Sequence, residues 1–235
     1  MNNKSIIDKI IKINKPITVK KYIDLCLYST DGYYKKSYIL GSKGDFITAP
    51  ETSQLFGEII GLYLLNYWQE ELNTSFNLIE LGPGHGTLLL DILRITKNYK
   101  DFIDKMVIQL IETNKVNIEI QKKNLLSFKN KFKIQNIKID WCNKFSPINM
   151  EPVIIIANEF FDCLPIKQFY KKNNKWFEKM IRFNHKLKNL EFFDSEIKEK
   201  KIINKINNYN HKNILEISRT RENYFNKICK HINKT

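Results

Sequence analysis

Three glycines at alternating positions are the first residues whose spacing could support chemistry. Gly82, Gly84 and Gly86 lie where a short apolar run gives way to apolar residues at helical spacing. Glycine admits positive φ angles and puts no side chain between the backbone and a ligand. Because the turn joins an expected strand to an expected helix, it is a candidate seat for a nucleotide-like cofactor.

The spacing of these glycines separates two classes of cofactor. A dinucleotide fingerprint has the order G-x-G-x-x-G, whereas here Thr87 occupies the third glycine position and Gly86 comes one residue early. Pro83 removes one N–H group from the loop and makes it a poorer cradle for pyrophosphate. With the acidic Glu80 near the end of the strand, the pattern favours S-adenosylmethionine (SAM) over NAD.

A second acidic residue closes the next apolar run. Residues 106–111 predict a strand, and Glu112 follows it 26 residues after Gly86. An α/β nucleotide-binding fold places there the carboxylate that accepts both ribose hydroxyls. An N-cap or a solvated strand end is the alternative for Glu112, and a tight surface turn is the alternative for the glycines.

The elements that must position these residues form an α/β pattern. Apolar runs alternate with helical periodicity, which implies parallel strands joined by right-handed crossovers. The expected strands are residues 78–81, 106–111, 137–141 and 153–157. Ligands of such sheets lie beyond the carboxyl ends of the strands. Asn158, Glu159 and Asp162 follow the fourth strand and are therefore candidate site residues.

The sequence indicates two regions. Residues 1–75 are expected to form a helical N-terminal element with an active-site loop, and residues 76–235 a Rossmann-like domain. A β-hairpin and a lysine-rich helix capped by Ser195 are expected as an insertion at about 166–210. The loop from Asp45 to Ser53 mixes polar and apolar residues, so we expect it to pack over the cofactor.

Composition narrows the class of protein. Of 235 residues, 43% are hydrophobic and 27% are charged, as in soluble globular proteins. No apolar run has the length of a membrane span, and the N-terminus shows no signal or transit pattern, so a cytoplasmic protein is expected. The four cysteines and four histidines have no metal-ligand spacing, so no metal is expected.

Net charge is +14, and residues 166–235 hold 18 Lys/Arg against 7 Asp/Glu. This excess could mark an acidic partner. The chain is also rich in Lys, Asn and Ile together, which is the pattern of biased codon usage. The oligomeric state is not indicated by the sequence.

Three segments together resemble a known family. They are Gly44-Asp45-Phe46-Ile47-Thr48-Ala49-Pro50-Glu51-Thr52-Ser53-Gln54-Leu55-Phe56-Gly57-Glu58, Glu80-Leu81-Gly82-Pro83-Gly84-His85-Gly86-Thr87 and Ala157-Asn158-Glu159-Phe160-Phe161-Asp162-Cys163-Leu164-Pro165. They are similar to the MidA-like family of class I SAM-dependent methyltransferases, whose mitochondrial members methylate an arginine of a respiratory complex I subunit. The resemblance runs from about Ile17 to Ser218.

The resemblance implies a class I methyltransferase fold, SAM as cofactor and a protein arginine as acceptor, with a complex I subunit as a candidate partner. The chain also differs from the family in two respects. His85 stands where the family has arginine, and the family's last strands have no counterpart, so the chain alone is expected to be poorly active. A non-catalytic assembly or binding protein of the same fold is therefore one alternative.

Site residues follow from the motifs and the resemblance. Glu159 and Asp162 could grip a guanidinium, because its planar fork matches carboxylate oxygens. Asn158 and Glu51 complete the expected catalytic group. The expected cofactor-binding residues are Gly82, Gly84, Gly86, Glu80, Glu112, Asp45 and Thr48.

A methyltransferase acting on an RNA base is the second alternative. Such enzymes often carry Asn/Asp-Pro-Pro-aromatic after the same strand, and Asn158 and Phe161 fit its ends. Glu159 and Phe160 replace both prolines. A carboxylate at this place favours a cationic acceptor over a base beside phosphates, so nucleic acid is not the expected partner.

Overall fold

The chain folds as two compact units in a computed structural model, which describes residues 3–35, 48–134, 136–145, 152–209 and 214–232. Residues 37–163 with 224–235 make one unit, called the sheet unit below. Residues 1–36 with 164–223 make the other, called the hairpin unit. This division differs from the expected boundary at residue 75, because the first helices pack on the hairpin rather than on the sheet.

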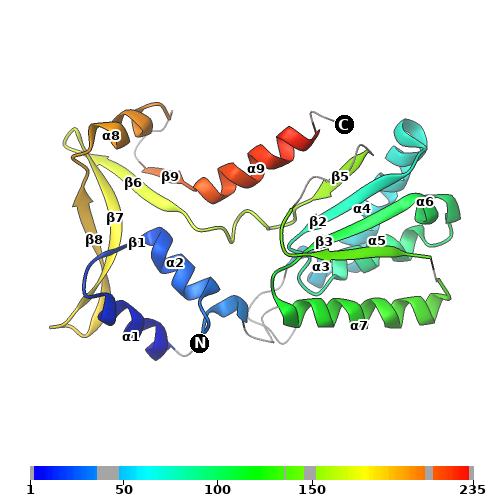
Figure 1. Cartoon of the computed structure of the whole chain (residues 1–235), viewed down its shortest axis with the longest axis horizontal. Coiled ribbons are helices and arrows are strands. Elements are labelled where there is room, and N and C mark those ends of the chain that lie inside the picture. Colours follow the sequence, from blue (N-terminus) through cyan, green and yellow to red (C-terminus); the bar gives the residue numbers. More distant parts are fainter. Residues whose placement is uncertain (1–2, 36–47, 135, 146–151, 210–213, 233–235) are drawn as a thin grey trace. The chain divides into compact units, whose positions relative to one another are not determined.

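The sheet unit is built on four parallel strands in the order β4-β3-β2-β5 (Figure 1). They are β2 (Phe76–Leu81), β3 (Met106–Ile111), β4 (Lys138–Cys142) and β5 (Val153–Ile156). These strands confirm the expected α/β fold. All six residues of β2 are buried, as expected for a central strand covered on both faces.

Helices connect and cover these strands. They are α3 (Ala49–Thr52), α4 (Gln54–Tyr67), the π-helical turn η2 (Trp68–Leu72), α5 (Thr87–Thr96), α6 (Lys100–Lys105) and α7 (Lys115–Phe132). The last helix, α9 (Arg219–Ile232), begins in the hairpin unit and ends in the sheet unit.

The two faces of the sheet bury different hydrophobic clusters. On one face Leu78 and Ile108 pack with residues of α4, α5 and α7. On the other face Ile79 and Ile111 pack with Ile228 of α9 and with aromatic residues that follow β5. Because successive residues of a strand point to opposite faces, this alternation fixes which side chains of β2 reach the helices.

Helix α4 packs closely against α5 along one side only. Gly57 and Gly61 are buried where the two helices meet. The opposite side of α4 exposes Leu55, Ile59 and Tyr63, with Tyr63 69% exposed. Within the described part of the chain, this side of α4 therefore lies open to solvent.

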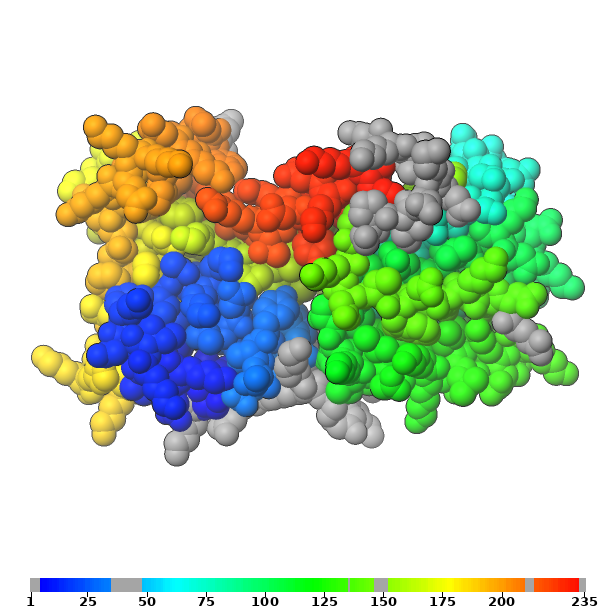
Figure 2. Space-filling view, viewed as in Figure 1, coloured from blue at the N-terminus to red at the C-terminus, as the bar shows by residue number. Residues whose placement is uncertain are grey.

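The hairpin unit contains an antiparallel sheet in the order β1-β7-β6-β9, with β8 also paired to β7. Its strands are β1 (Ile17–Thr18), β6 (Lys167–Lys172), β7 (Lys175–Asn184), β8 (Asn189–Glu196) and β9 (Ile214–Ile217). Its helices are α1 (Asn3–Ile13), α2 (Val19–Tyr28), the 3-10 turn η1 (Tyr33–Lys35) and α8 (Lys200–Asn207). Figure 2 shows the turn between β7 and β8, in yellow, standing out from the surface.

The hairpin unit corrects one local prediction. Ser195 does not cap a helix but lies within β8, opposite Glu178 of β7. Strand β8 continues to Glu196, and α8 begins only at Lys200, after Glu199 as its N-cap. Serine suits both a helix cap and an edge strand, and the cross-strand pairing decides between them.

In the described residues, no helix is both long and apolar enough to cross a membrane.

Candidate active site

The glycine turn joins β2 to α5 at the carboxyl edge of the parallel sheet. Gly82, Gly84 and Gly86 have φ angles of 68°, 58° and 78°, in the region that favours glycine. A Cβ atom on Gly82 would come within 3.0 Å of the Phe160 ring, and one on Gly86 within 3.3 Å of Gln121. Conformation and close packing therefore both require glycine at these two positions.

Glu80 lies near the end of β2, fully buried beside the turn. Burial raises the pKa of its carboxyl group to about 8, so the side chain is largely protonated at neutral pH. Its neighbours across the strands are Leu110 and Ile156. A buried neutral carboxyl group can donate a hydrogen bond, which an ionised carboxylate cannot.

The raised pKa of Glu80 predicts how stability depends on pH. The folded state holds this proton up to about pH 8, whereas the unfolded chain releases it near the ordinary pKa of about 4.3. Stability from this group is therefore complete below pH 4 and is lost as the pH rises through 8, at up to about 1.4 kcal/mol per pH unit. Urea unfolding of wild type and Glu80→Gln between pH 5 and 9 should show a smaller decline in the variant. Equal slopes would contradict the buried protonated state.

Glu112 closes β3 and is already held in one orientation. Its Oε1 accepts hydrogen bonds from the backbone N–H groups of Thr113 and Asn114, both at 2.7 Å, and its Oε2 accepts from Asn117 at 3.1 Å. Asn114 is the N-cap of α7. The carboxylate thus lies at the start of a helix and at the same edge of the sheet as the glycine turn.

A narrow cavity of about 50 Å³ opens at this edge. Its lining includes Glu80, Asn158 and Thr48, together with the residues of the glycine turn. It therefore brings together three regions that are far apart in the sequence and that sequence analysis assigned to one site.

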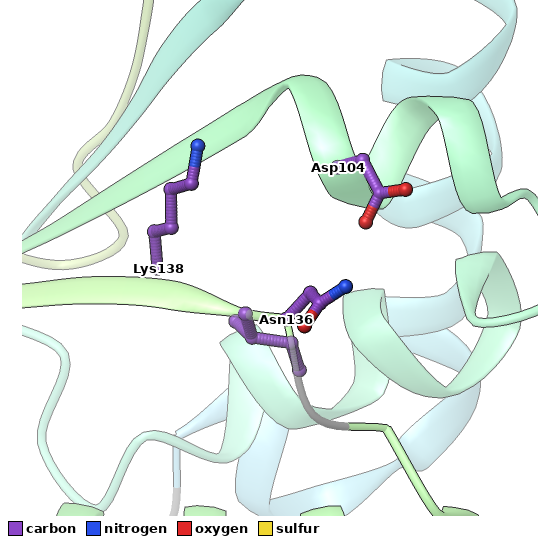
Figure 3. Close-up of a pocket in the computed structure, with 4 residues that line it drawn as sticks. Asp104, Asn136 and Lys138 are labelled. Carbon is purple, nitrogen blue, oxygen red and sulfur yellow. The ribbon is translucent and has the colours of Figure 1, made fainter.

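A wider hollow of about 410 Å³ lies elsewhere, lined by Asp104, Asn136, Ile137 and Lys138. Figure 3 shows Asp104 and Asn136 facing each other across it. Asp104 precedes β3, and the other three residues precede or begin β4, so the hollow is at the amino ends of the strands. Ligands of parallel sheets bind at the carboxyl ends, and we place the site at the narrower cavity.

Glu51, expected near the acceptor, lies against the glycine turn. Its Oε1 accepts a hydrogen bond from Thr87 Oγ1 at 2.8 Å and lies 3.6 Å from His85 Nδ1. The contact with His85 and the hydrogen bond from Thr87 lower the pKa of Glu51, which keeps its carboxylate charged. Thr48 lines the cavity, while Asp45 falls outside the described residues.

The segment after β5 carries the candidate acceptor residues. Asn158 lines the cavity. Glu159 has a φ angle of 51°, which is rare for a residue with a side chain. Its side chain is exposed, and within the described part of the chain its carboxylate has no recorded hydrogen bond or ion pair. Asp162 is also exposed, and the ring of Phe160 between them packs over Gly82.

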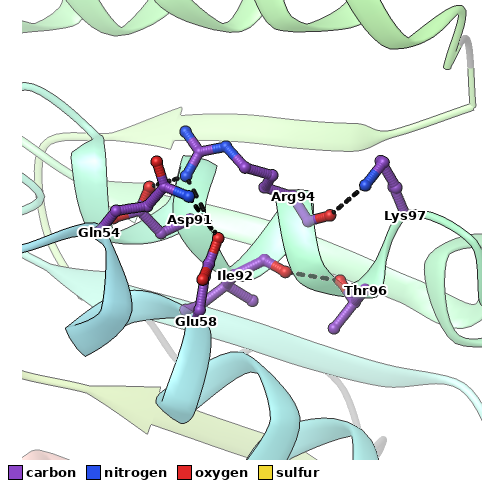
Figure 4. A network of polar contacts seen from close by, with 7 residues as sticks. All are labelled: Gln54, Glu58, Asp91, Ile92, Arg94, Thr96 and Lys97. Carbon is purple, nitrogen blue, oxygen red and sulfur yellow. Dashed lines mark hydrogen bonds and ion pairs between the residues drawn. The ribbon is translucent and has the colours of Figure 1, made fainter.

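A polar network supports the helix that begins at the turn. Arg94 of α5 donates to Asp91 and lies 3.9 Å from Glu58 of α4, and Gln54 also donates to Glu58 (Figure 4). Asp91 is only 2% exposed, and burial raises its pKa. This network links α4 to α5, which carries Thr87 in its first turn.

The sequence does not indicate the two side chains of α7 that hold the turn, Gln121 and Asn124. Both donate to backbone carbonyl groups of the turn. An amide on a polar helix has no pattern that distinguishes it from a solvated side chain, so only the tertiary contact reveals its role.

Comparison with known proteins shows the family to which the chain belongs. A family model for S-adenosyl-L-methionine-dependent methyltransferases, Methyltransf_28, matches residues 59–235, more than half of the sequence. The chain belongs to this family. The match includes the glycine turn, Glu112 and the Asn158–Asp162 segment, whereas Thr48 and Glu51, which also line the cavity, precede it.

Relatives with assigned names agree with the family. "Protein arginine methyltransferase NDUFAF7 homolog, mitochondrial" of Caenorhabditis elegans is 35% identical over 195 residues, which are 74% of this chain and 44% of that protein. "Protein arginine methyltransferase NDUFAF7, mitochondrial" of Homo sapiens is 34% identical over 190 residues, 73% of this chain and 43% of that protein. The chain thus spans less than half the length of these relatives.

A solved structure supports the fold. The crystal structure of a COG1565 superfamily member from Burkholderia thailandensis, bound to S-adenosyl-homocysteine, superposes with a TM-score of 0.76 at 18% identity. The match covers 96% of this chain and 58% of that one. At this identity the likeness concerns the fold.

The relatives correct the predicted location. Several of them are named as mitochondrial proteins. The expectation of a cytoplasmic protein, which rested on the absence of a transit pattern at residues 1–9, is contradicted by these names. The composition of the first residues is a poor guide to the location of a protein, because a targeting signal is recognised by a receptor and does not determine the fold.

Proposed function

We propose that this chain binds SAM at the carboxyl edge of β2 and β3 and takes part in methyl transfer to a protein arginine. The observation that carries the proposal is that the glycine turn and buried Glu80 line one cavity, with oriented Glu112 at the end of the neighbouring strand, in a member of a SAM-dependent family. SAM supplies a methyl group on a sulfonium centre, and the residues of the chain bind and orient the partners of the transfer.

Each part of the site has a physical role in this proposal. The glycines let the backbone approach the cofactor closely. Glu112 offers carboxylate oxygens to ribose hydroxyls, as acidic residues at this place in α/β nucleotide folds do. Methyl transfer is an in-line displacement, so holding the acceptor in line contributes several kcal/mol through orientation alone.

The acceptor is assigned from the carboxylates that follow β5. Glu159 and Asp162 are exposed and close in sequence to Asn158, which lines the cavity. Two carboxylates suit a guanidinium, which remains charged and offers paired donors. They would repel the phosphates of a nucleic acid. A protein arginine therefore fits better than an RNA base, and a respiratory complex I subunit is the partner class that the family resemblance suggests.

Replacement of Glu112 tests the cofactor site. Glu112→Ala should weaken the binding of S-adenosylhomocysteine by about 1 to 3 kcal/mol, because buried ribose hydroxyls would lose their acceptor. Isothermal titration measures the change. Glu119→Ala, at an exposed position of the nearby helix α7, is the matched control and should bind as wild type does. Unchanged affinity in Glu112→Ala would remove this carboxylate from the site.

The same titration tests the cofactor class. Wild type should release or absorb heat on binding S-adenosylhomocysteine and give none with NAD. Binding of NAD without binding of S-adenosylhomocysteine would refute the proposal and point to an oxidoreductase.

Cofactor binding without transfer is the second candidate function. It is favoured by β5, which carries Asn158 beyond its end and pairs on one side only, with β2, among the described strands. An edge strand constrains the residues that follow it less than a central strand does. In this case S-adenosylhomocysteine would bind, yet no acceptor in a cell extract would receive a methyl group.

A further inference from the structure

Two side chains of α7 hold the glycine turn from behind. Gln121 Nε2 donates to the carbonyl oxygen of Gly84 at 2.8 Å, and Asn124 Nδ2 donates to the carbonyl oxygen of His85 at 3.2 Å. The two residues are three apart and so share one face of the helix. Two consecutive carbonyl groups of the turn are therefore directed toward α7.

Gln121 is itself fixed by the next strand. Trp141 Nε1 of β4 donates to Gln121 Oε1 at 2.9 Å, and Gln121 is 3% exposed. The indole N–H can only donate and the Gly84 carbonyl can only accept, so these partners determine which end of the amide is oxygen and which is nitrogen. A chain of hydrogen bonds thus runs from β4 through α7 to the turn.

This arrangement controls where one backbone N–H group points. In a planar trans peptide, the C=O of one residue and the N–H of the next point in opposite directions. With the Gly84 carbonyl directed toward α7, the N–H of His85 is directed away from α7. The N–H of Gly86, in contrast, is already used by the carbonyl of Pro83 at 2.8 Å.

We propose that Gln121, held by Trp141, is a positioning residue for the cofactor. It sets the turn so that the N–H of His85 is presented to acceptor atoms of the bound ligand. Its stem also forms the surface against which Gly86 packs, since a Cβ there would lie 3.3 Å from Gln121 Cγ. The inference rests on the proposed SAM site and adds to it a residue that need not touch SAM.

Gln121→Glu tests the donor role through pH. At pH 8.5 the carboxylate would place two acceptors, its own oxygen and the Gly84 carbonyl, against each other. The affinity for S-adenosylhomocysteine should then fall roughly 5- to 150-fold, the cost of an unsatisfied buried polar group. At pH 5.5 a protonated carboxyl group can donate to Gly84 as the amide does, so affinity should return toward that of wild type.

The comparison is made with wild type at each pH, because Glu80, His85 and Lys122 carry ionisable groups near this contact. Ser127→Glu adds the same charge at an exposed position of α7 and serves as the matched control. It should bind as wild type does at both pH values. Thermal unfolding of each variant shows whether the fold is retained.

Two further variants test the positioning role of Gln121 if Gln121→Glu does not fold. Trp141→Phe keeps an aromatic ring but removes the donor to Gln121, and Asn124→Ala removes the second bond to the turn. Each should weaken binding roughly 2- to 10-fold, as expected for one hydrogen bond.

The outcomes separate the two proposals. Binding by wild type with no change in these variants, or a loss in Gln121→Glu that is equal at both pH values, would overturn the positioning role and leave the cofactor site standing. Failure of wild type to bind S-adenosylhomocysteine would overturn both. Recovery of binding at low pH in Gln121→Glu alone supports the positioning role.

Discussion

Glu159→Gln is expected to slow methyl transfer to a protein arginine roughly 10- to 150-fold. The glutamine keeps the size and shape of the side chain but loses a charge-assisted hydrogen bond to the guanidinium, worth about 1.5 to 3 kcal/mol. Affinity for S-adenosylhomocysteine should not change, because Glu159 is exposed and is not part of the cavity lining that surrounds the glycine turn.

The backbone at Glu159 supports this assignment. Its φ of 51° lies in the left-handed region, where a residue with a side chain is strained. Strain of this kind persists where the surrounding structure imposes it, and it is concentrated at functional sites. Glu159→Gly should therefore keep the fold and lose the transfer. Glu119→Gln, an exposed carboxylate on α7, is the control; if it slowed transfer as much as Glu159→Gln, the effect would be one of general charge.

Gly61→Ala is expected to destabilise the sheet unit by about 1 to 3 kcal/mol, the usual cost of overpacking. A Cβ on Gly61 would lie 2.6 Å from Ile95 Cγ2 and 3.0 Å from Ile92 Cα, so a backbone atom of α5 would have to move. The gain in helix propensity, about 1 kcal/mol, offsets only part of this. Gly57→Ala meets the side chain of Asp91 at 2.4 Å and should behave similarly.

Urea unfolding measures the loss, with Asn66→Ala as the control. Asn66 lies on an exposed position of the same helix, where alanine should be neutral or slightly stabilising. Because α5 begins at the glycine turn, Gly61→Ala should also weaken cofactor binding. Unchanged stability in both glycine variants would show that α4 and α5 are not packed as closely as described.

Local patterns in the sequence predicted the central elements well. The run of residues 106–111 is β3, and the glycines after β2 form the turn that begins α5. These elements are specified by short-range features: a continuous apolar run that favours a buried strand, and glycines where positive φ is needed. The candidate cofactor residues lie beside them for the same reason, because carboxyl ends of parallel strands share one edge.

Contacts between segments that are distant in the sequence could not be predicted from local patterns. Strand β1 pairs with β7, so the N-terminal helices belong to the hairpin unit rather than to a separate N-terminal element. Ser195 does not cap a helix, because it lies in β8 and pairs with Glu178 of the neighbouring strand β7. Glu51 accepts a hydrogen bond from Thr87, 36 residues further along the chain, and the sequence did not indicate this particular partner.

The central claim is tested most directly by transfer of a labelled methyl group from SAM to acceptors in a mitochondrial extract, with protein and RNA separated afterwards. The account predicts label in protein, recovered as methylarginine after hydrolysis, with a rate that falls roughly 10- to 150-fold in Glu159→Gln. Label in RNA, or no label in any protein while S-adenosylhomocysteine binds normally, would contradict it.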